Sequence, residues 1–393
     1  MLVFFVITFK FFFMKAKQLR LLFVTVFAGA IILSSCKKNL PPGCLCDCSP
    51  NDLVATTSVY ASGLNLPRGL KFGPDGNLYV AEAGTGGANT TNSSSCMQVP
   101  PPVGPYSGSI NGSRISKIVN GAPITVVDNL PSSMDAQGDI MGVGDVAFIG
   151  NTLYGVLAGA GCSHGVPSIP NGVIKALPNK KWQMVADLSS FLQGHPVANP
   201  NAGDFEPDGT WYSMQAVGNE LYAVEPNHGE IDKIDQMGHV SRLIDISATQ
   251  GHIVPTSIIF HDGSFYMVNL STFPIPSNSN VYKITLSGKI STVASGFSMA
   301  QSIAFDKEGG MYVLEGTTNN PFPTPGTGDV VRIDPSGVKT TLVSGLNFPT
   351  AMVMGPDEKL YISNWGFGPP TVGGGQILQV SISCQKQTSK KLD

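Results

Sequence analysis

Residues 78–82 read Leu-Tyr-Val-Ala-Glu, and this short stretch recurs along the chain. Its Leu-Tyr core, sometimes with Phe or Met in the first place, returns five more times, at Leu153, Leu221, Phe265, Met311 and Leu360. Most intervals are roughly 45 residues, a period typical of propeller blades. Around each copy, short alternating apolar runs joined by tight turns predict four antiparallel strands. Six such units predict an all-β fold, a six-bladed β-propeller.

The two ends of the repeat region complement each other. Residues 53–64 (LVATTSVYASGL) match the ends of the later repeats, where that segment is expected to form the fourth, outermost strand. The last repeat supplies only three strands, so the N-terminal strand is predicted to complete blade six and remove an unpaired sheet edge. The blades are expected at 65–130, 131–190, 204–248, 252–295, 296–345 and 346–382, the last completed by residues 53–64.

The composition agrees with this fold. The chain has 393 residues, of which 13% are charged, with 45 Gly and 29 Pro. Such a composition suits many short strands joined by turns and argues against a helical protein. The net charge of −3 and the lack of a basic block after the N-terminal segment argue against a nucleic-acid partner.

Residues 1–36 have the pattern of a lipoprotein signal peptide. A basic segment at 14–20 precedes an apolar run at 21–33, which ends in Leu-Ser-Ser-Cys at Cys36. Met14 alone would begin such a signal, and cleavage before Cys36 would leave that residue lipidated. An uncleaved membrane anchor is the alternative, although the apolar run is shorter than the ~20 residues that a span needs. Both interpretations place the mature chain outside the cytoplasm, tethered to a membrane in the periplasm or at the outer membrane.

The remaining boundaries follow from these assignments. Residues 37–52 are expected to form a tether rich in Cys and Pro, 53–384 the propeller, and 385–393 a disordered tail. Six cysteines remain after Cys36, and pairing is expected in an exported protein. Cys96 and Cys162 lie in loops of adjacent blades and are predicted to form a disulfide. Cys384 is expected to pair with one cysteine of the tether, which holds Cys44, Cys46 and Cys48; a soft-metal site at those three is the alternative.

Long loops are expected on one face of the propeller. The first-to-second-strand turns are short, whereas the insertions after the second strands, such as 83–112, 158–171 and 316–327, are long. These insertions and the connections between blades emerge on the same face. Because loops on a rigid scaffold commonly carry binding sites, the site is predicted on this loop-rich face, at the mouth of the channel.

The fifth position of each Leu-Tyr core supplies the first candidate site. This position is equivalent in every blade, and its residues are Glu82, Leu157, Glu225, Asn269, Glu315 and Asn364. Converging oxygen ligands could bind Ca²⁺ or Mg²⁺, with Glu82, Glu225, Asn269 and Glu315 as the metal ligands. The alternative is that these side chains bind backbone groups where each blade opens.

Two histidines are expected on the same face. His228 lies three residues after Glu225, and His252 leads into blade four. They could flank one site in which Glu225 acts as a general base or metal ligand, with His164 and Glu206 in neighbouring loops. The alternative is a hydrogen bond within each histidine's own loop. The sequence shows no Ser-His-Asp order, H-E-x-x-H motif or phosphate-binding loop.

Several irregular loop strings resemble those of the ScyD/ScyE family. They are LPRGL at 66–70, AGAGCSHG at 158–165, GDFEPDGTWYSM at 203–214, EPNHGE at 225–230, QGHIVPT at 250–256 and NPFPTPGTG at 320–328. The resemblance covers about 63–382 and implies an NHL and SMP-30-like, lactonase-like propeller found outside the cytoplasm. It implies no settled reaction. The Leu-Tyr-x-x-Glu repeat is also similar to that of streptogramin lyases, without a residue-by-residue match of catalytic positions.

Three functional hypotheses follow. The first is a membrane-tethered propeller that binds a small polar ligand or a protein partner without catalysis. The second is a metal-dependent hydrolase or lyase, in which the cation held by the four ligands above activates water, or His228 acts as base. The third is a scaffold for an envelope protein, which predicts an exposed apolar patch around Phe273 and Phe322. The low charge and the lack of a catalytic triad favour binding.

Overall fold

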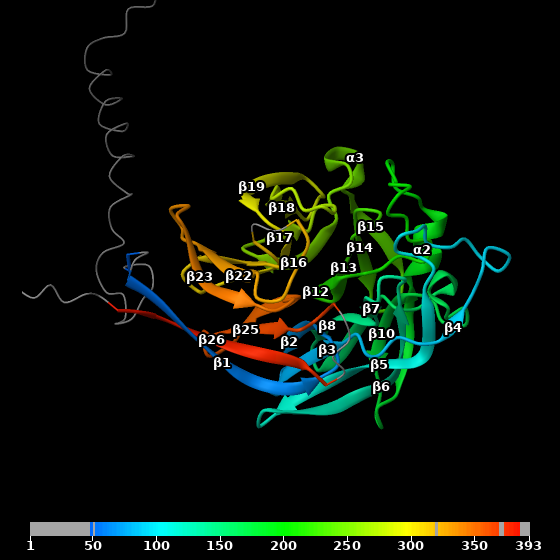
Figure 1. The fold of residues 1–393 in the computed structure, drawn as a ribbon, viewed down its shortest axis with the longest axis horizontal. Coiled ribbons are helices and arrows are strands. Elements are labelled where there is room, and N and C mark those ends of the chain that lie inside the picture. The colour runs from blue at the N-terminus through cyan, green and yellow to red at the C-terminus, as the bar shows by residue number, and fades with distance from the viewer. Residues whose placement is uncertain (1–47, 50–51, 319–320, 369–372, 386–393) are drawn as a thin grey trace, which may run out of the picture. The chain divides into compact units, whose positions relative to one another are not determined.

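The structure is a computed structural model that describes residues 48–49, 52–318, 321–368 and 373–385. The predicted signal peptide and the positions of Cys36, Cys44 and Cys46 lie outside the described residues. The described chain forms six antiparallel sheets arranged as the blades of a propeller, which confirms the predicted fold (Figure 1).

Each blade contributes one sheet, and the strands have the following bounds. Blade one holds β2 (Pro67–Phe72), β3 (Leu78–Glu82), β4 (Asn89–Thr90), β5 (Ser107–Val119), β6 (Ala122–Met134) and β7 (Ile140–Met141). Blade two holds β8 (Val143–Ile149), β9 (Thr152–Leu157), β10 (Gly172–Ala176) and β11 (Trp182–Asp187). Blade three holds β12 (Ser213–Val217), β13 (Glu220–Glu225), β14 (Glu230–Asp235) and β15 (Val240–Asp245).

The second half of the ring is more regular. Blade four holds β16 (Pro255–His261), β17 (Ser264–Asn269), β18 (Ser279–Thr285) and β19 (Ile290–Phe297). Blade five holds β20 (Ala300–Phe305), β21 (Met311–Glu315), β22 (Gly328–Ile333) and β23 (Lys339–Leu346). Blade six holds β24 (Ala351–Met354), β25 (Leu360–Asn364) and β26 (Gly375–Cys384), with β1 (Leu53–Leu64) as its outermost strand.

The boundary between blades one and two differs from the prediction at residue 130. Strand β6 continues to Met134 and pairs with β7, so the first sheet extends to Met141. Strand β5 also begins at Ser107, inside the segment expected to be a loop insertion. The pairing between β5 and β6 shifts register three times between Ser109 and Ser116. Bulges of this kind bend strands, and here they allow two long strands to reach beyond the regular blade.

The Leu-Tyr repeat shapes the core because its alternating side chains pack between blades. In β3, Leu78 and Val80 are fully buried against blade six, where they contact Tyr361 and Ile377. Equivalent apolar layers lie between the other neighbouring blades. The first strand of each blade contacts the first strands of both neighbours, so β2, β8, β12, β16, β20 and β24 form a closed inner ring.

Ring closure follows the prediction. Strand β1 pairs antiparallel with β26 from Leu53 opposite Cys384 to Leu64 opposite Gly375 (Figure 1). A disulfide joins Cys48 to Cys384 at the end of this pair, so Cys48 is the tether cysteine that pairs with Cys384. The predicted disulfide between Cys96 and Cys162 is also present.

Helical structure is sparse in the described residues. A 3-10 turn covers η3 (Cys162–His164), and the α-helices are α2 (Leu188–Gly194) and α3 (Ser247–Gln250). Asp187 caps α2 by accepting a hydrogen bond from Ser190 N. Within the described segments, none of these helices has the length and apolar character required to cross a membrane.

Polar side chains join the inner strands. Asp145 Oδ2 accepts a hydrogen bond from Met214 N at 2.9 Å, which links blade two to blade three. Ser213 Oγ accepts one from Ile258 N at 3.0 Å, which links blade three to blade four. Ser302 Oγ accepts one from Met352 N at 3.0 Å in the same way between blades five and six. Small polar residues at this level therefore fix the register between neighbouring blades.

Gly69 occupies the equivalent position in blade one, and substitution by alanine is expected to destabilise the fold by about 2 kcal/mol, as overpacking does in other cores. A Cβ at this position would lie 1.9 Å from Asp145 Oδ1 and 2.2 Å from Asp145 Cγ, so Asp145 would have to move away from Met214 N. Urea denaturation measures the change. Gly194→Ala is the matched control, because a Cβ there meets nothing within 4 Å. Equal stability of the two variants would contradict the expectation.

Candidate functional site

The fifth residues of the Leu-Tyr cores, called the ring positions below, lie at the ends of the second strands. The polar ones bind backbone groups of the segment through which the chain enters each blade. Glu225 Oε1 accepts a hydrogen bond from Thr210 N at 3.0 Å. Asn364 Oδ1 accepts one from Asn347 N at 2.8 Å. Glu82 and Glu315 accept hydrogen bonds from Asn65 N and Ser298 N in the same manner, whereas Asn269 Nδ2 donates to the carbonyl oxygen of Ile253. Leu157, the sixth position, is a buried apolar residue. The arrangement is the one described by the backbone-binding alternative.

Each polar ring position also faces a partner on the third strand of its own blade. Glu82 forms an ion pair with Arg114 at 2.7 Å. In blades three and five the pairs are two acids, and in blades four and six they are two amides. These pairs are Glu225 with Glu230, Glu315 with Asp329, Asn269 with Asn280 and Asn364 with Gln376. Each polar ring position therefore has its neighbouring polar side chain within its own blade.

The structure does not bring the four predicted metal ligands together. Glu82, Glu225, Asn269 and Glu315 are each turned to the backbone of their own blade. Over the described residues, no three His, Cys, Asp or Glu side chains are grouped so that they could hold one metal ion. This arrangement does not fit the shared cation site that the repeat suggested. Side chains at equivalent positions of six blades need not point to one common site.

The two predicted histidines contact one loop segment, residues 204–206. His228 Nε2 lies 2.9 Å from the carbonyl oxygen of Glu206, and the His228 ring packs against Phe205. His252 Nε2 lies 2.9 Å from Asp204 Oδ2. The backbone N–H of His228 donates to Glu225 Oε2 at 2.6 Å. The loop before β12 thus gathers His228, His252 and Glu225, although their side chains are engaged with protein groups.

His164 and Glu206 form a buried cluster with Tyr106. The Tyr106 hydroxyl donates to Glu206 Oε1 at 3.1 Å, and the rings of Tyr106 and His164 are 4.4 Å apart. His164 Nε2 lies 3.4 Å from Glu206 Oε2, and neither atom has a hydrogen-bond partner in the described part of the chain. Burial lowers the pKa of His164 to about 4 and raises the pKa of Glu206 well above its usual range. Burial thus favours the uncharged form of both groups, as expected for side chains removed from water.

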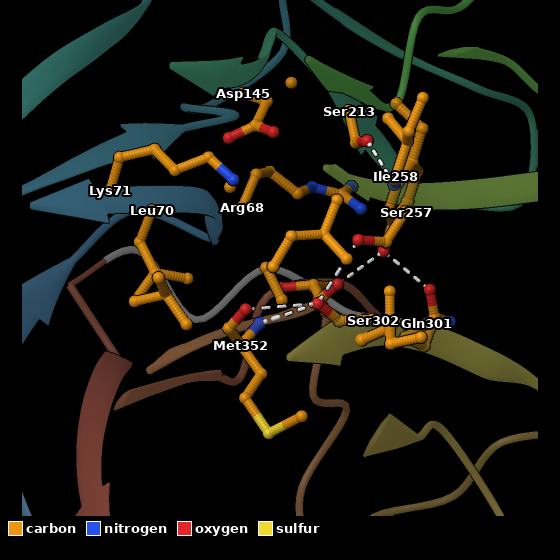
Figure 2. Close-up of a pocket in the computed structure, with 18 residues that line it drawn as sticks. Arg68, Leu70, Lys71, Asp145, Ser213, Ser257, Ile258, Gln301, Ser302 and Met352 are labelled. Atoms are coloured by element: carbon orange, nitrogen blue, oxygen red, sulfur yellow. Dashed lines mark hydrogen bonds between the residues drawn. The ribbon is translucent and has the colours of Figure 1, made fainter. Parts of the chain in front are cut away.

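A polar cavity of about 30 Å³ lies inside the inner ring (Figure 2). All six first strands, or the residues just before them, line it. Its polar side chains are Arg68, Lys71, Asp145, Tyr212, Ser213, Ser257, Gln301, Ser302 and Thr350. A cavity of this size has room for about two waters.

Tyr212 crosses the end of the cavity nearer the loop-rich face. Its hydroxyl lies 2.5 Å from Gln301 Oε1 and 2.7 Å from the carbonyl oxygen of Thr350. These contacts connect blade three to blades five and six. Arg68 lies at the equivalent strand position in blade one, and its Nη2 donates to the carbonyl oxygen of Ile140 at 2.6 Å. Arg68, Tyr212 and Gln301 therefore form a polar layer at the mouth of the channel.

The cations of the cavity lack carboxylate partners. Arg68 and Lys71 both come from β2 and extend into the cavity (Figure 2). In the segments that the structure describes, no carboxylate oxygen lies within 4.0 Å of either cation. Asp145 is the carboxylate that lines the cavity, and its two oxygens accept hydrogen bonds from Val146 N and Met214 N. The cavity thus combines two unpaired cations with one acid that binds backbone.

Reasoning from the sequence assigned no role to these cavity residues. The Leu-Tyr core marks the second strand, whereas the cavity is lined by the first strand, about ten residues earlier. Alignment of that earlier position across the repeats places Arg68, Tyr212, Gln301 and Thr350 at one level. The recurrence of polar side chains at this position in four blades was the signal available in the sequence.

Two aromatic residues of the loop-rich face are exposed. Phe273 and Phe322 are 50% and 54% exposed, and their rings stack with centroids 6.0 Å apart. Their loops are joined by a hydrogen bond from Ile275 N to the carbonyl oxygen of Pro321. The exposed aromatic pair that the scaffold hypothesis predicted is therefore present.

No protein-family model and no curated protein sequence matches this chain. Solved structures do match in fold. One is a structural genomics protein of unknown function from Bacteroides thetaiotaomicron, with 12% identity, a TM-score of 0.53, and coverage of 84% of this chain and 76% of that one. Another is a putative oxidoreductase (glucose dehydrogenase) from Thermus thermophilus, with 15% identity, a TM-score of 0.52, and coverage of 83% of this chain and 100% of that one.

A third match is a PQQ-bound aldose sugar dehydrogenase from Streptomyces coelicolor, with 12% identity, a TM-score of 0.51, and coverage of 84% of this chain and 98% of that one. Identities this low show a common fold and do not transfer an activity. By its sheet order and by these likenesses, the chain is a six-bladed β-propeller.

Proposed function

We propose that this chain is an exported, lipid-anchored propeller of the ScyD/ScyE type that binds a small polar ligand at the loop-rich end of its channel. The cavity inside the inner ring carries this proposal. Binding sites are commonly concave and present a few convergent polar groups from a rigid scaffold. Here Arg68, Tyr212 and Gln301 reach the same cavity from three different blades.

The two disulfides support the proposed location. Cys48 pairs with Cys384 and Cys96 with Cys162. Disulfides persist in oxidising compartments and are rare in the cytosol. Together with the lipobox pattern that ends at Cys36, they favour a chain tethered outside the cytoplasm.

The dimensions of the cavity indicate how a ligand would bind. A space of about 30 Å³ accepts one small functional group rather than a whole metabolite. The remainder of the ligand would lie among the long loops of the loop-rich face. Ligand affinity would then depend on the cavity for one group and on the loops for the rest.

Filling the cavity is expected to abolish binding. Ser257 lines the cavity, and among the described residues its hydroxyl makes a single long contact, of 3.4 Å with Ser302 Oγ. Ser257→Leu should therefore occupy the space at little cost in hydrogen bonds. The measurement is ligand-observed NMR of the purified protein with a panel of sugars, sugar acids, amino acids and short carboxylic acids.

The control variant is Ser291→Leu, on the exposed surface of the outer strand β19. We expect binders of the wild-type protein to bind Ser291→Leu and to lose their signal with folded Ser257→Leu. A panel without any binder of the wild type, or binders that keep their signal with Ser257→Leu, would contradict the proposal.

A further inference from the structure

We infer that the group bound inside the channel is a carboxylate, held between Arg68 and Lys71. The inference rests on the proposed function and names the chemical class of its ligand. It stands on the two cations, on the acid near them and on the size of the cavity.

Arg68 is half-buried and uses little of its hydrogen-bonding capacity. A guanidinium has five N–H donors, and the hydrogen bond from Nη2 to the Ile140 carbonyl uses one of them. Placing a cation in a confined site without a counter-ion is unfavourable unless another anion completes it. Asp139 attracts Arg68 at longer range, but its Oδ1 accepts a hydrogen bond from Gly368 N at 3.1 Å. The remaining donors of Arg68 are therefore available to an added acceptor.

Lys71 adds a second positive charge on the same wall. It lies on β2, three residues beyond Arg68, and extends toward Asp145 (Figure 2). Asp145 attracts Lys71 electrostatically, but in the described residues no Asp145 oxygen lies within 4.0 Å of Lys71 Nζ, and both oxygens accept backbone N–H groups. The charged side chains that line the cavity are two cations and one anion, so the lining has a net positive charge.

The size of the cavity distinguishes between anions. A carboxylate places two oxygens in the space, comparable to the two waters for which about 30 Å³ has room. A phosphate group presents more oxygens around a tetrahedral centre and requires more space. Arg68 can donate two parallel N–H groups to a planar carboxylate, and the hydroxyls of Ser257 and Ser302 line the same cavity.

The test compares ligands that differ only in the proposed group. Propionate and propionamide have nearly the same shape, but only propionate is charged. Isothermal titration calorimetry of the purified protein at fixed ionic strength is expected to show propionate binding at least tenfold more tightly than propionamide. Inorganic phosphate is the third probe and is expected to bind more weakly than propionate.

Substitutions of the two cations test whether propionate binds to them in the channel. Lys71→Met and Arg68→Met are each expected to weaken propionate binding at least tenfold, and Arg68→Lys is expected to retain part of it. The side chain of Lys71 has no hydrogen bond in the described part of the chain, so Lys71→Met should fold even if Arg68→Met does not. Lys289→Met removes an equal charge from an exposed turn and should leave propionate affinity unchanged.

The outcomes separate this inference from the proposed function. Equal affinities for propionate and propionamide, or unchanged propionate affinity in Lys71→Met, would overturn the carboxylate assignment while ligand binding in the channel stood. Tighter binding of phosphate would overturn it as well. Propionate binding that survives in Ser257→Leu would place the site elsewhere and would count against both. No propionate binding to the wild-type protein would also overturn the carboxylate assignment.

Discussion

Replacing Cys384 with serine is expected to lower the free energy of unfolding by about 2–5 kcal/mol, among the largest effects of any single substitution in this chain. The Cys48–Cys384 disulfide spans 336 residues, nearly the whole propeller. A crosslink across so long a loop restricts the unfolded chain strongly. In the folded state it also holds the end of β1 against β26, where blade six takes its outer strand from the other end of the sequence.

Cys384 is the residue to change because the tether offers substitutes for Cys48. Cys44 and Cys46 lie close to Cys48 in the sequence and could pair with Cys384 in its place. Urea denaturation without reductant should therefore compare Cys384→Ser with wild type and with Cys96→Ser. The Cys96–Cys162 disulfide spans 66 residues and joins two loops, so its loss should cost about 1.4 kcal/mol less. A Cys384→Ser variant as stable as wild type would contradict this account of ring closure.

Glu315→Gln is expected to stabilise the propeller by about 2 kcal/mol at pH 9 and to change little at pH 5. Glu315 faces Asp329 across β21 and β22, and both side chains are more than 90% buried. Burial, together with the charge of Glu315, raises the pKa of Asp329 to about 8, and burial also raises the pKa of Glu315. Two acids in contact away from water cannot both ionise without a large cost.

The direction of the pH effect on stability follows from the raised pKa values of this acid pair. Asp329 stays protonated in the folded chain up to about pH 8, whereas in the unfolded chain it ionises near 3.8. The unfolded state therefore binds fewer protons between these two values, and stability falls as pH rises through that range. A glutamine at 315 can still accept the hydrogen bond from Ser298 N and can donate to an ionised Asp329. It recreates the kind of contact that Asn364 makes with Gln376 in blade six.

Thermal or urea unfolding of wild type and Glu315→Gln from pH 5 to pH 9 measures this effect. Glu358→Gln is the matched control, because Glu358 is 57% exposed and pairs with Lys307, a cation that keeps its charge from pH 5 to pH 9. We expect the stability difference between Glu315→Gln and wild type to grow with pH, and the difference for Glu358→Gln to stay constant. A difference for Glu315→Gln that does not change with pH would show that the acid pair does not control this part of the stability.

The fold could be predicted because repeated local patterns determine it. Each Leu-Tyr core forms the largely buried second strand of a blade, and six copies leave few arrangements other than a propeller. The N-terminal strand was recognisable because residues 53–64 match the fourth strands of other blades. Blade one was predicted less well, because the bulged pairing of β5 with β6 depends on contacts that local patterns do not contain.

The candidate site was harder to predict. A sequence repeat shows which residues are equivalent in the six blades, but it does not show how far each residue lies from the channel axis. Glu82 and Glu225 are equivalent, yet each lies behind the innermost strand and binds its own backbone segment. Arg68 and Lys71 line the cavity because β2 is innermost, which is a property of the assembled ring. Among the described residues, Arg68 and Lys71 form no ion pair because the carboxylates that attract them, Asp139 and Asp145, accept hydrogen bonds elsewhere. These two acids come from a different part of the chain.

Binding of a small polar ligand in the channel can be tested directly. The most direct measurement is isothermal titration calorimetry of the tightest compound from the NMR panel against wild type, Ser257→Leu and Ser291→Leu. Binding in the channel predicts that Ser257→Leu weakens the affinity at least tenfold, about 1.4 kcal/mol or more in binding free energy, while Ser291→Leu binds as the wild type does. Equal affinities for all three proteins would place the ligand outside the channel and contradict the account.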